Sequence, residues 1–149
     1  FSFLFIISPV LNTYMNDAYT SALFDVVRDT SANYGYSLPE HLEAYVVMLL
    51  ASHVDKPNFL PSNSFAEKYL SLNTKMDAKQ LGDTCLFVTG VFPSYGKINR
   101  TYYQNIGIGS YSSMNGELFE QLAIHFEFLS NFIELSVSSP KQKRYNLFQ

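Results

Sequence analysis

The chain has 149 residues and a mass of 17.0 kDa, which suits one globular domain and is short for two. Hydrophobic residues make up 47% and charged residues 15% of it, which excludes a chain that is disordered throughout. With ten Lys and Arg against thirteen Asp and Glu, the net charge is −3, so nucleic acid is not predicted as a partner.

A single cysteine, Cys85, excludes a disulfide within the chain and a zinc site built on a cysteine pair. A lone cysteine is typical of a reducing compartment and predicts a cytoplasmic protein. His41, His53 and His125 lack the spacing of a metal site on one helix, and we interpret His53 and His125 as partly buried structural residues. A metal site drawn from separate helices stays open. No metal and no cofactor are predicted.

The chain opens with an apolar segment, Phe1 to Ile7, far shorter than the roughly 20 residues that span a bilayer. No transmembrane segment is therefore expected. Because such a patch is seldom left in water, we expect residues 1–10 to form an arm that packs on the chain's own core or on a second copy. The end of a truncated signal peptide is the less favoured alternative, since no basic region or cleavage pattern accompanies the segment.

Residues 11–138 are predicted to form a single compact all-α domain of five or six helices. Apolar residues recur at helical spacing over 11–32, which predicts the first helix. A second helix is predicted to run up to about Val54, because Ser37-Leu38-Pro39-Glu40 has the pattern of a capping box with proline in the first turn.

Two further helices follow a proline-containing loop at 55–63. Ser64-Phe65-Ala66-Glu67 is a second capping box and predicts a short helix that ends near Asn73. The stretch 76–92 is apolar nearly all round and fits either a buried strand or a buried helix. Helix is favoured, because a lone strand among helices would find a pairing partner only in the arm.

After a turn at 93–99, Thr101-Tyr102-Tyr103-Gln104 is a third capping box, for a helix that should stop near Asn115. The last helix is predicted over 117–137. It has a core-facing apolar stripe of Phe119, Leu122, Phe126, Leu129 and Ile133.

A second apolar strip on the last helix comprises Ile124, Phe128 and Leu135. An acidic stripe of Glu120, Glu127 and Glu134 lies between the two apolar strips. A helix that is apolar on two sides is either central in a bundle or shared between subunits. The second strip is therefore a candidate interface, and a homodimer is the predicted oligomer.

The basic, polar end of the chain, residues 139–149, is predicted to be a flexible tail. Together with the apolar arm, this tail leaves weak association with a membrane surface as a minor alternative.

One composite pattern resembles a known family. The segment from Leu81 to Phe92 reads L-G-D-T-C-L-F-V-T-G-V-F, and Tyr102-Tyr103 follows it with Gly107 and Tyr111 at fixed offsets. This resembles an uncharacterised bacterial family whose members carry L-G-D-x-x-L-F-V-x-G-x-F and then Y-Y-x-x-x-G-x-x-x-Y. The resemblance covers about thirty residues and implies a helical cytoplasmic protein with no established activity. Family members continue into a further C-terminal segment, and we expect any site completed by that segment to be absent here.

Five residues of this pattern, together with Arg100, are also the candidate ligand site. They are Asp83, Arg100, Tyr102, Tyr103, Gly107 and Tyr111. An ionised Asp83 in an apolar stretch needs a partner, so it either anchors a ligand or forms a structural ion pair that fixes the turn at 93–99. Gly107 leaves a notch between Tyr103 and Tyr111, which either admits a flat ligand or lets another helix approach. The structural interpretation is favoured in both cases.

No catalytic residue is predicted, because Cys85 lies in an apolar run and no serine sits in a nucleophile elbow. The leading hypothesis is a non-enzymatic module that binds itself or another protein. The alternative is a small-molecule binder or enzyme whose pocket lies between 82–92 and 102–111.

Overall fold

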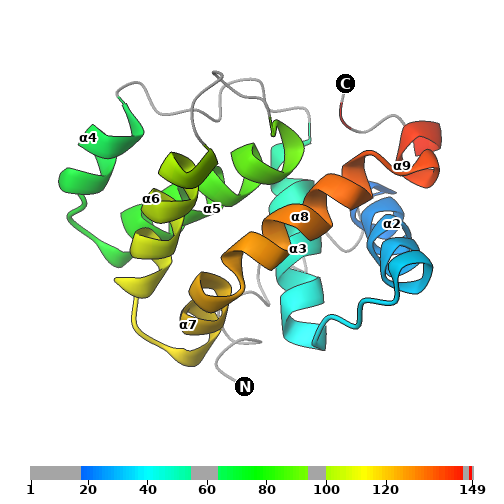
Figure 1. The fold of residues 1–149 in the computed structure, drawn as a ribbon, viewed down its shortest axis with the longest axis horizontal. Helices are drawn as coiled ribbons and strands as arrows, with labels where there is room; N and C mark the ends of the chain where they lie inside the picture. The colour runs from blue at the N-terminus through cyan, green and yellow to red at the C-terminus, as the bar shows by residue number, and fades with distance from the viewer. Residues whose placement is uncertain (1–17, 55–63, 94–99, 146–147, 149) are drawn as a thin grey trace. The chain divides into compact units, whose positions relative to one another are not determined.

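The computed structural model describes residues 18–54, 64–93, 100–145 and 148. Within these residues the chain forms eight α-helices and no strand, which confirms the predicted all-α class (Figure 1). The prediction of five or six helices was too low. The last predicted helix is divided in two, and a short helix forms in the segment that was predicted to be a tail. The apolar arm at 1–10 lies outside the described residues.

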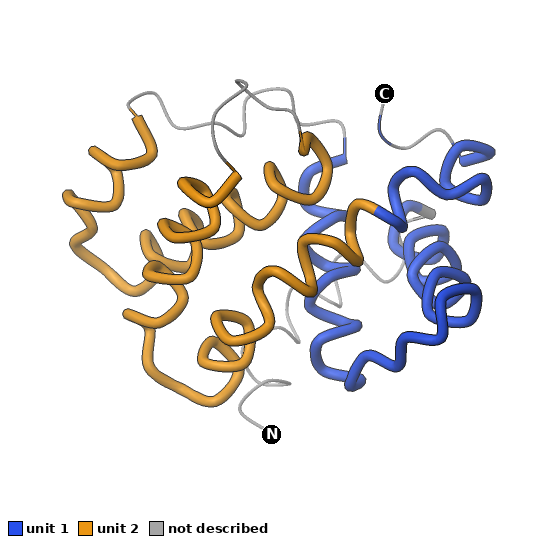
Figure 2. Tube along the Cα trace, viewed as in Figure 1, with its two compact units in different colours: residues 1–56, 135–149 blue, residues 57–134 orange. Residues whose placement is uncertain are grey.

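The helices are named as in Figure 1. Their bounds are α2 Ala18–Tyr34, α3 Glu40–His53, α4 Phe65–Leu70, α5 Lys75–Val91, α6 Arg100–Ser112, α7 Glu117–Ile124, α8 Phe126–Val137 and α9 Pro140–Tyr145. The chain divides into two compact units, which are described separately below (Figure 2). One comprises residues 1–56 and 135–149, and the other residues 57–134. This division is finer than the single helical domain that the sequence predicts.

In the first unit, α3 is apolar over most of its surface and is correspondingly buried from Tyr45 to Ala51. Its N-terminus differs from the prediction. Pro39 occupies the N-cap position and no side chain caps the helix, so Ser37 does not form a capping box. The proline carbonyl instead accepts hydrogen bonds from the backbone N–H groups of Leu42 and Glu43.

Helix α9 replaces the first part of the predicted flexible tail. Ser139 caps it by accepting a hydrogen bond from the backbone N–H of Gln142, 3.1 Å away. α9 packs against α2, where the hydroxyl of Tyr145 donates to a carboxylate oxygen of Asp25 at 3.1 Å. No pattern in the sequence predicts a packing partner for these polar residues, and α2 is the partner in the structure.

The second unit contains α4 to α7 and the first part of α8. The ambiguous stretch 76–92 is helical, as favoured, and α5 is capped by Thr74, whose hydroxyl accepts from the backbone N–H of Asp77. Ser64 caps α4 in the same way, as predicted. α5 and α6 pack along each other over most of their length. Their contact, the α5–α6 seam, is the main core of this unit.

Two boundaries in this unit differ from the prediction. α6 already begins at Arg100, so Thr101 lies inside the helix and does not open a capping box. The predicted helix over 117–137 is interrupted at His125, whose backbone (φ −98°, ψ 16°) leaves the helical region. The predicted core-facing stripe is nevertheless buried on both sides of this break, with exposed fractions of 6% or less.

Candidate functional site

Asp83 lies on α5 with both of its carboxylate oxygens engaged. Lys79, one turn earlier, donates from Nζ to Oδ2 at 2.7 Å, and Tyr111 of α6 donates its hydroxyl to Oδ1 at 2.6 Å. Tyr111 is completely buried, and the Asp83 side chain is 13% exposed. The carboxylate therefore forms an ion pair within α5 and ties α5 to α6. The structural interpretation had placed the effect of this ion pair on the turn at 93–99, and residues 94–99 of that turn lie outside the described residues.

Glycines let the helices of the seam approach closely. A Cβ atom at Gly107 would lie 2.5 Å from two ring carbons of Phe126 and 2.9 Å from the Cβ of Cys85. A Cβ at Gly82 would lie 2.6 Å from the ring of Tyr111. Real Cβ atoms do not come this close to other heavy atoms, so only glycine fits. The predicted notch at Gly107 is filled by the Phe126 ring, whose centroid lies 6.0 Å from that of Tyr111.

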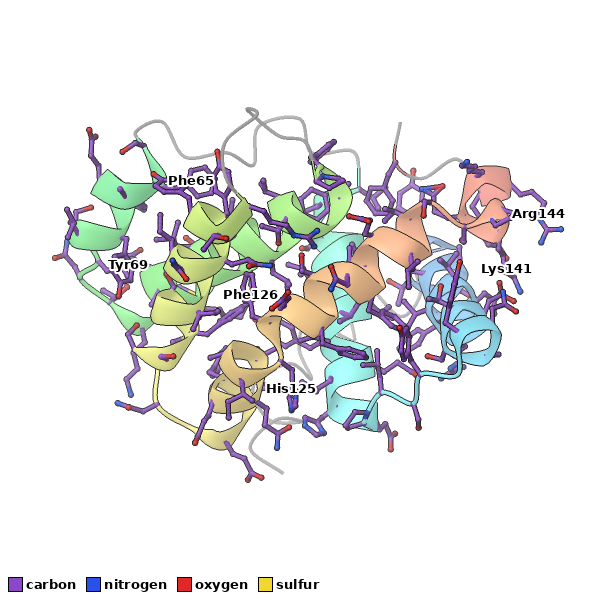
Figure 3. All side chains as sticks on the ribbon, viewed as in Figure 1. Phe65, Tyr69, His125, Phe126, Lys141 and Arg144 are labelled. Carbon is purple, nitrogen blue, oxygen red and sulfur yellow. The ribbon has the colours of Figure 1, made fainter. Side chains whose placement is uncertain are left out.

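The two adjacent tyrosines of α6 contact α4. The hydroxyl of Tyr102 accepts a hydrogen bond from the backbone N–H of Ala66 at 3.1 Å. The buried ring of Tyr103 meets the ring of Phe65 edge to face, with 4.9 Å between centroids. Figure 3 shows Phe65 and Tyr69 on α4. The first contact satisfies one of the orphan N–H groups at the start of α4, and both contacts hold this short helix on α6.

Arg100 ties the start of α6 to α8. Its Nη2 donates to the Ser130 hydroxyl at 2.6 Å and to Oδ1 of Asn131 at 2.9 Å. Its Nη1 lies 3.5 Å from Oε1 of Glu134. Ser130 and Asn131 were not predicted as partners of Arg100. The only signal was their spacing with Glu134 on one side of α8, which does not distinguish a guanidinium site from an exposed polar face.

The six candidate ligand residues do not converge on one point. Asp83 and Tyr111 are in contact, but Arg100 is eleven residues before Tyr111, about 16 Å along the helix axis at ~1.5 Å per residue. Arg100 and Asp83 therefore lie at different ends of the α5–α6 seam. Each candidate side chain bonds or packs against other residues of its own unit.

The candidate interface residues have a different environment. Ile124, the last residue of α7, is 69% exposed, and Phe128, in the first turn of α8, is 37% exposed. Glu120, four residues before Ile124, and Glu127, next to Phe128 in the sequence, are also exposed. We call these four residues the outer face. The other two members of the predicted strips differ from this set, because Leu135 is partly buried and Glu134 pairs with Arg100.

No activated nucleophile is found among the candidates. Burial raises the pKa of the Cys85 thiol far above its ordinary range, so it stays protonated at neutral pH. Among the described residues, no three His, Cys, Asp or Glu side chains lie together as a metal site would require. None of the described helices is both long enough and apolar enough to cross a membrane.

Comparison with family models, with curated proteins and with solved structures finds no match to this chain. The resemblance to the bacterial family therefore stays a prediction, and the function is argued from the geometry alone.

Proposed function

We propose that this protein is a non-enzymatic cytoplasmic module that binds a second copy of itself through the outer face. The observation that carries the proposal is the exposure of Ile124 and Phe128, two large apolar side chains one helical turn apart in sequence. Single exposed apolar residues are common on protein surfaces, whereas neighbouring ones mark interaction sites more often.

The contacts of the alternative site support this choice. A ligand pocket needs polar groups directed into an open space. Asp83, Arg100 and Tyr111 instead direct their polar atoms at side chains of the same or a neighbouring helix, at distances of 2.6 to 3.5 Å. Chemistry at Asp83 would first have to break its bonds to Lys79 and Tyr111. The lone buried thiol of Cys85 supports the cytoplasmic assignment.

The test is sedimentation velocity over a hundredfold range of protein concentration. The wild type is expected to dimerise, and Ile124→Ser combined with Phe128→Ser is expected to weaken dimerisation at least tenfold. Leu70→Ser is the matched control, since Leu70 is 84% exposed but lies at the end of α4. A wild type that stays monomeric throughout contradicts the proposal, as does a loss of dimer in the Leu70 variant equal to that in the double variant.

A further inference from the structure

The two ends of the C-terminal helical region carry opposite charges. Residues 117–137 contain four glutamates and no lysine or arginine, whereas residues 138–149 contain Lys141, Lys143 and Arg144 and no acidic residue. The outer face belongs to the first segment, and α9 belongs to the second. A contact between the outer face and α9 would therefore pair opposite charges, whereas either surface against itself would pair like charges.

The charges on the outer face disfavour a symmetric contact of this face with itself. Glu120 and Glu127 lie one turn or less from Ile124 and Phe128, and all four side chains are exposed. Two outer faces packed against each other would bring carboxylates of the same sign close together while removing water from them. Like-charge contacts of this kind are unfavourable in interfaces. The apolar pair therefore suits a partner with positive charges around it.

α9 presents such charges on an anchored helix. Gln142 is 2% exposed and Tyr145 bonds to Asp25, so one side of α9 is fixed on α2. Lys143 and Arg144 are exposed, and Figure 3 shows Lys141 and Arg144 extending from α9. The aliphatic stems of these side chains can cover apolar surface while their charged ends meet carboxylates.

Three of the other described cations form ion pairs within the chain. Arg28 is paired with Glu43, Lys79 with Asp83 and Arg100 with Glu134. α9 supplies three of the five described lysines and arginines outside these pairs, the others being Lys68 and Lys75. It is the densest group of positive charge in the described residues.

We infer that the outer face of one copy binds the exposed, basic side of α9 of a second copy. This inference rests on the proposed function and names the surface that the outer face recognises. Such a contact joins two different surfaces. It closes as a dimer when each copy gives and receives one α9, and it propagates into longer assemblies when the rotation between copies does not close.

Charge reversal on each side gives the sharpest test. One variant carries Lys143→Glu and Arg144→Glu, and the other carries Glu120→Lys and Glu127→Lys. Each variant alone has like charges on both surfaces, so we expect its self-association to weaken at least tenfold. When the two variants are mixed in equal amounts, every contact between unlike copies pairs opposite charges again. The mixture is therefore expected to regain association to within about threefold of the wild type.

Two controls accompany the test, which uses sedimentation velocity at 50 mM and 500 mM salt. Lys68→Glu with Lys75→Glu makes the same change in net charge elsewhere and is expected to leave association unchanged. Circular dichroism melting of every variant reports folding. Association of the wild type is expected to weaken at the higher salt, where the Debye length falls from more than 10 Å to less than 5 Å.

The outcomes separate this inference from the proposed function. If both charge-reversed variants dimerise like the wild type, or if mixing them restores nothing, the inference is overturned. If the inference is overturned but Ile124→Ser with Phe128→Ser still abolishes the dimer, the proposed function stands and only the role of α9 is wrong. A monomeric wild type overturns both.

Discussion

The α5–α6 seam and the outer face contain similar residue types and have opposite environments. At the seam, aromatic rings pack against glycines, and the carboxylate of Asp83 accepts hydrogen bonds from Lys79 and Tyr111. On the outer face, Phe128 and Ile124 retain much of their exposed surface next to carboxylates. The seam contains the recognisable sequence pattern, yet its contacts are those of packing. Exposed apolar surface is therefore the better guide to function in this chain.

The first way to test this contrast compares two phenylalanines two residues apart on α8. Phe126 is fully buried against Gly107, whereas Phe128 is 37% exposed. Phe126→Ala should lower the free energy of unfolding by about 3–5 kcal/mol, because it leaves a cavity in the seam. Phe128→Ala should cost less than about 1 kcal/mol. Urea denaturation followed by circular dichroism measures both, and similar losses for the two variants would show that the contrast is wrong.

The second comparison uses two glycines on α6. Gly107→Ala places a Cβ against the Phe126 ring and the Cβ of Cys85, and should cost about 2 kcal/mol through overpacking. Gly109→Ala is the matched control. Its Cβ would meet only the hydroxyl end of the Tyr69 side chain, which is 37% exposed and able to swing away.

Gly109→Ala should therefore be neutral or stabilising by up to about 1 kcal/mol, as expected when a helical glycine is replaced. Thermal melting of the two variants under one condition decides the outcome. A stabilised Gly107→Ala protein would mean that the seam has room for a side chain and that the notch is open.

The third change removes the charge of Asp83. Asp83→Asn should cost about 2 kcal/mol of unfolding free energy, because it weakens a partly buried ion pair and the bond from Tyr111. Asp77→Asn, in the exposed first turn of the same helix, is the control and should cost less than about 1 kcal/mol. Unchanged stability of Asp83→Asn, with loss of a small molecule that copurifies with the wild type, would favour the ligand pocket instead.

The smallest expected effect concerns the hydrogen bond between Tyr145 and Asp25. Like the Tyr111–Asp83 bond it joins a tyrosine to a carboxylate, but it is exposed. The hydrogen bond from Tyr145 to Asp25 raises the pKa of Tyr145 above its ordinary value, and burial and the charge of Asp25 add to the shift. A raised pKa in the folded state means that this contribution to stability is complete below about pH 10 and is lost as the pH rises through the raised pKa.

Asp25→Asn should therefore move the ionisation of Tyr145 back toward its ordinary range. Titration of the tyrosine ring resonances by NMR measures this shift. An unchanged Tyr145 titration in the variant would show that α9 is not held on α2 by this bond.

Features that follow from local patterns were predictable in part, since the cap at Ser64 formed and the capping boxes at Ser37 and Thr101 did not. The caps at Ser64 and the core stripe on 117–137 follow from hydrogen-bonding geometry and helical periodicity, which are properties of neighbouring residues. The break at His125 and the helix α9 were missed. Next to each of them the structure has a contact with a residue distant in sequence, Phe126 with Gly107 and Tyr145 with Asp25, and no local pattern predicts such a contact.

The candidate site was also predictable only in part. The spacing of Tyr103, Gly107 and Tyr111 identified a close helix contact, because that face is set by the helical period. The partners on the other side of the contact, Phe126 and Cys85, were not identified, since no spacing in a single chain determines which helix enters a notch. The same limit explains why Arg100 was assigned to a pocket, whereas its side chain bonds to residues of α8.

Native mass spectrometry of protein purified without added ligands can decide between the outer face and the seam, because one spectrum reports both the oligomer and any bound small molecule. We expect a dimer without extra mass, which Ile124→Ser with Phe128→Ser converts to monomer. A monomer that carries a reproducible extra mass, lost on Asp83→Asn, would show that self-association is wrong and make the α5–α6 seam the functional site.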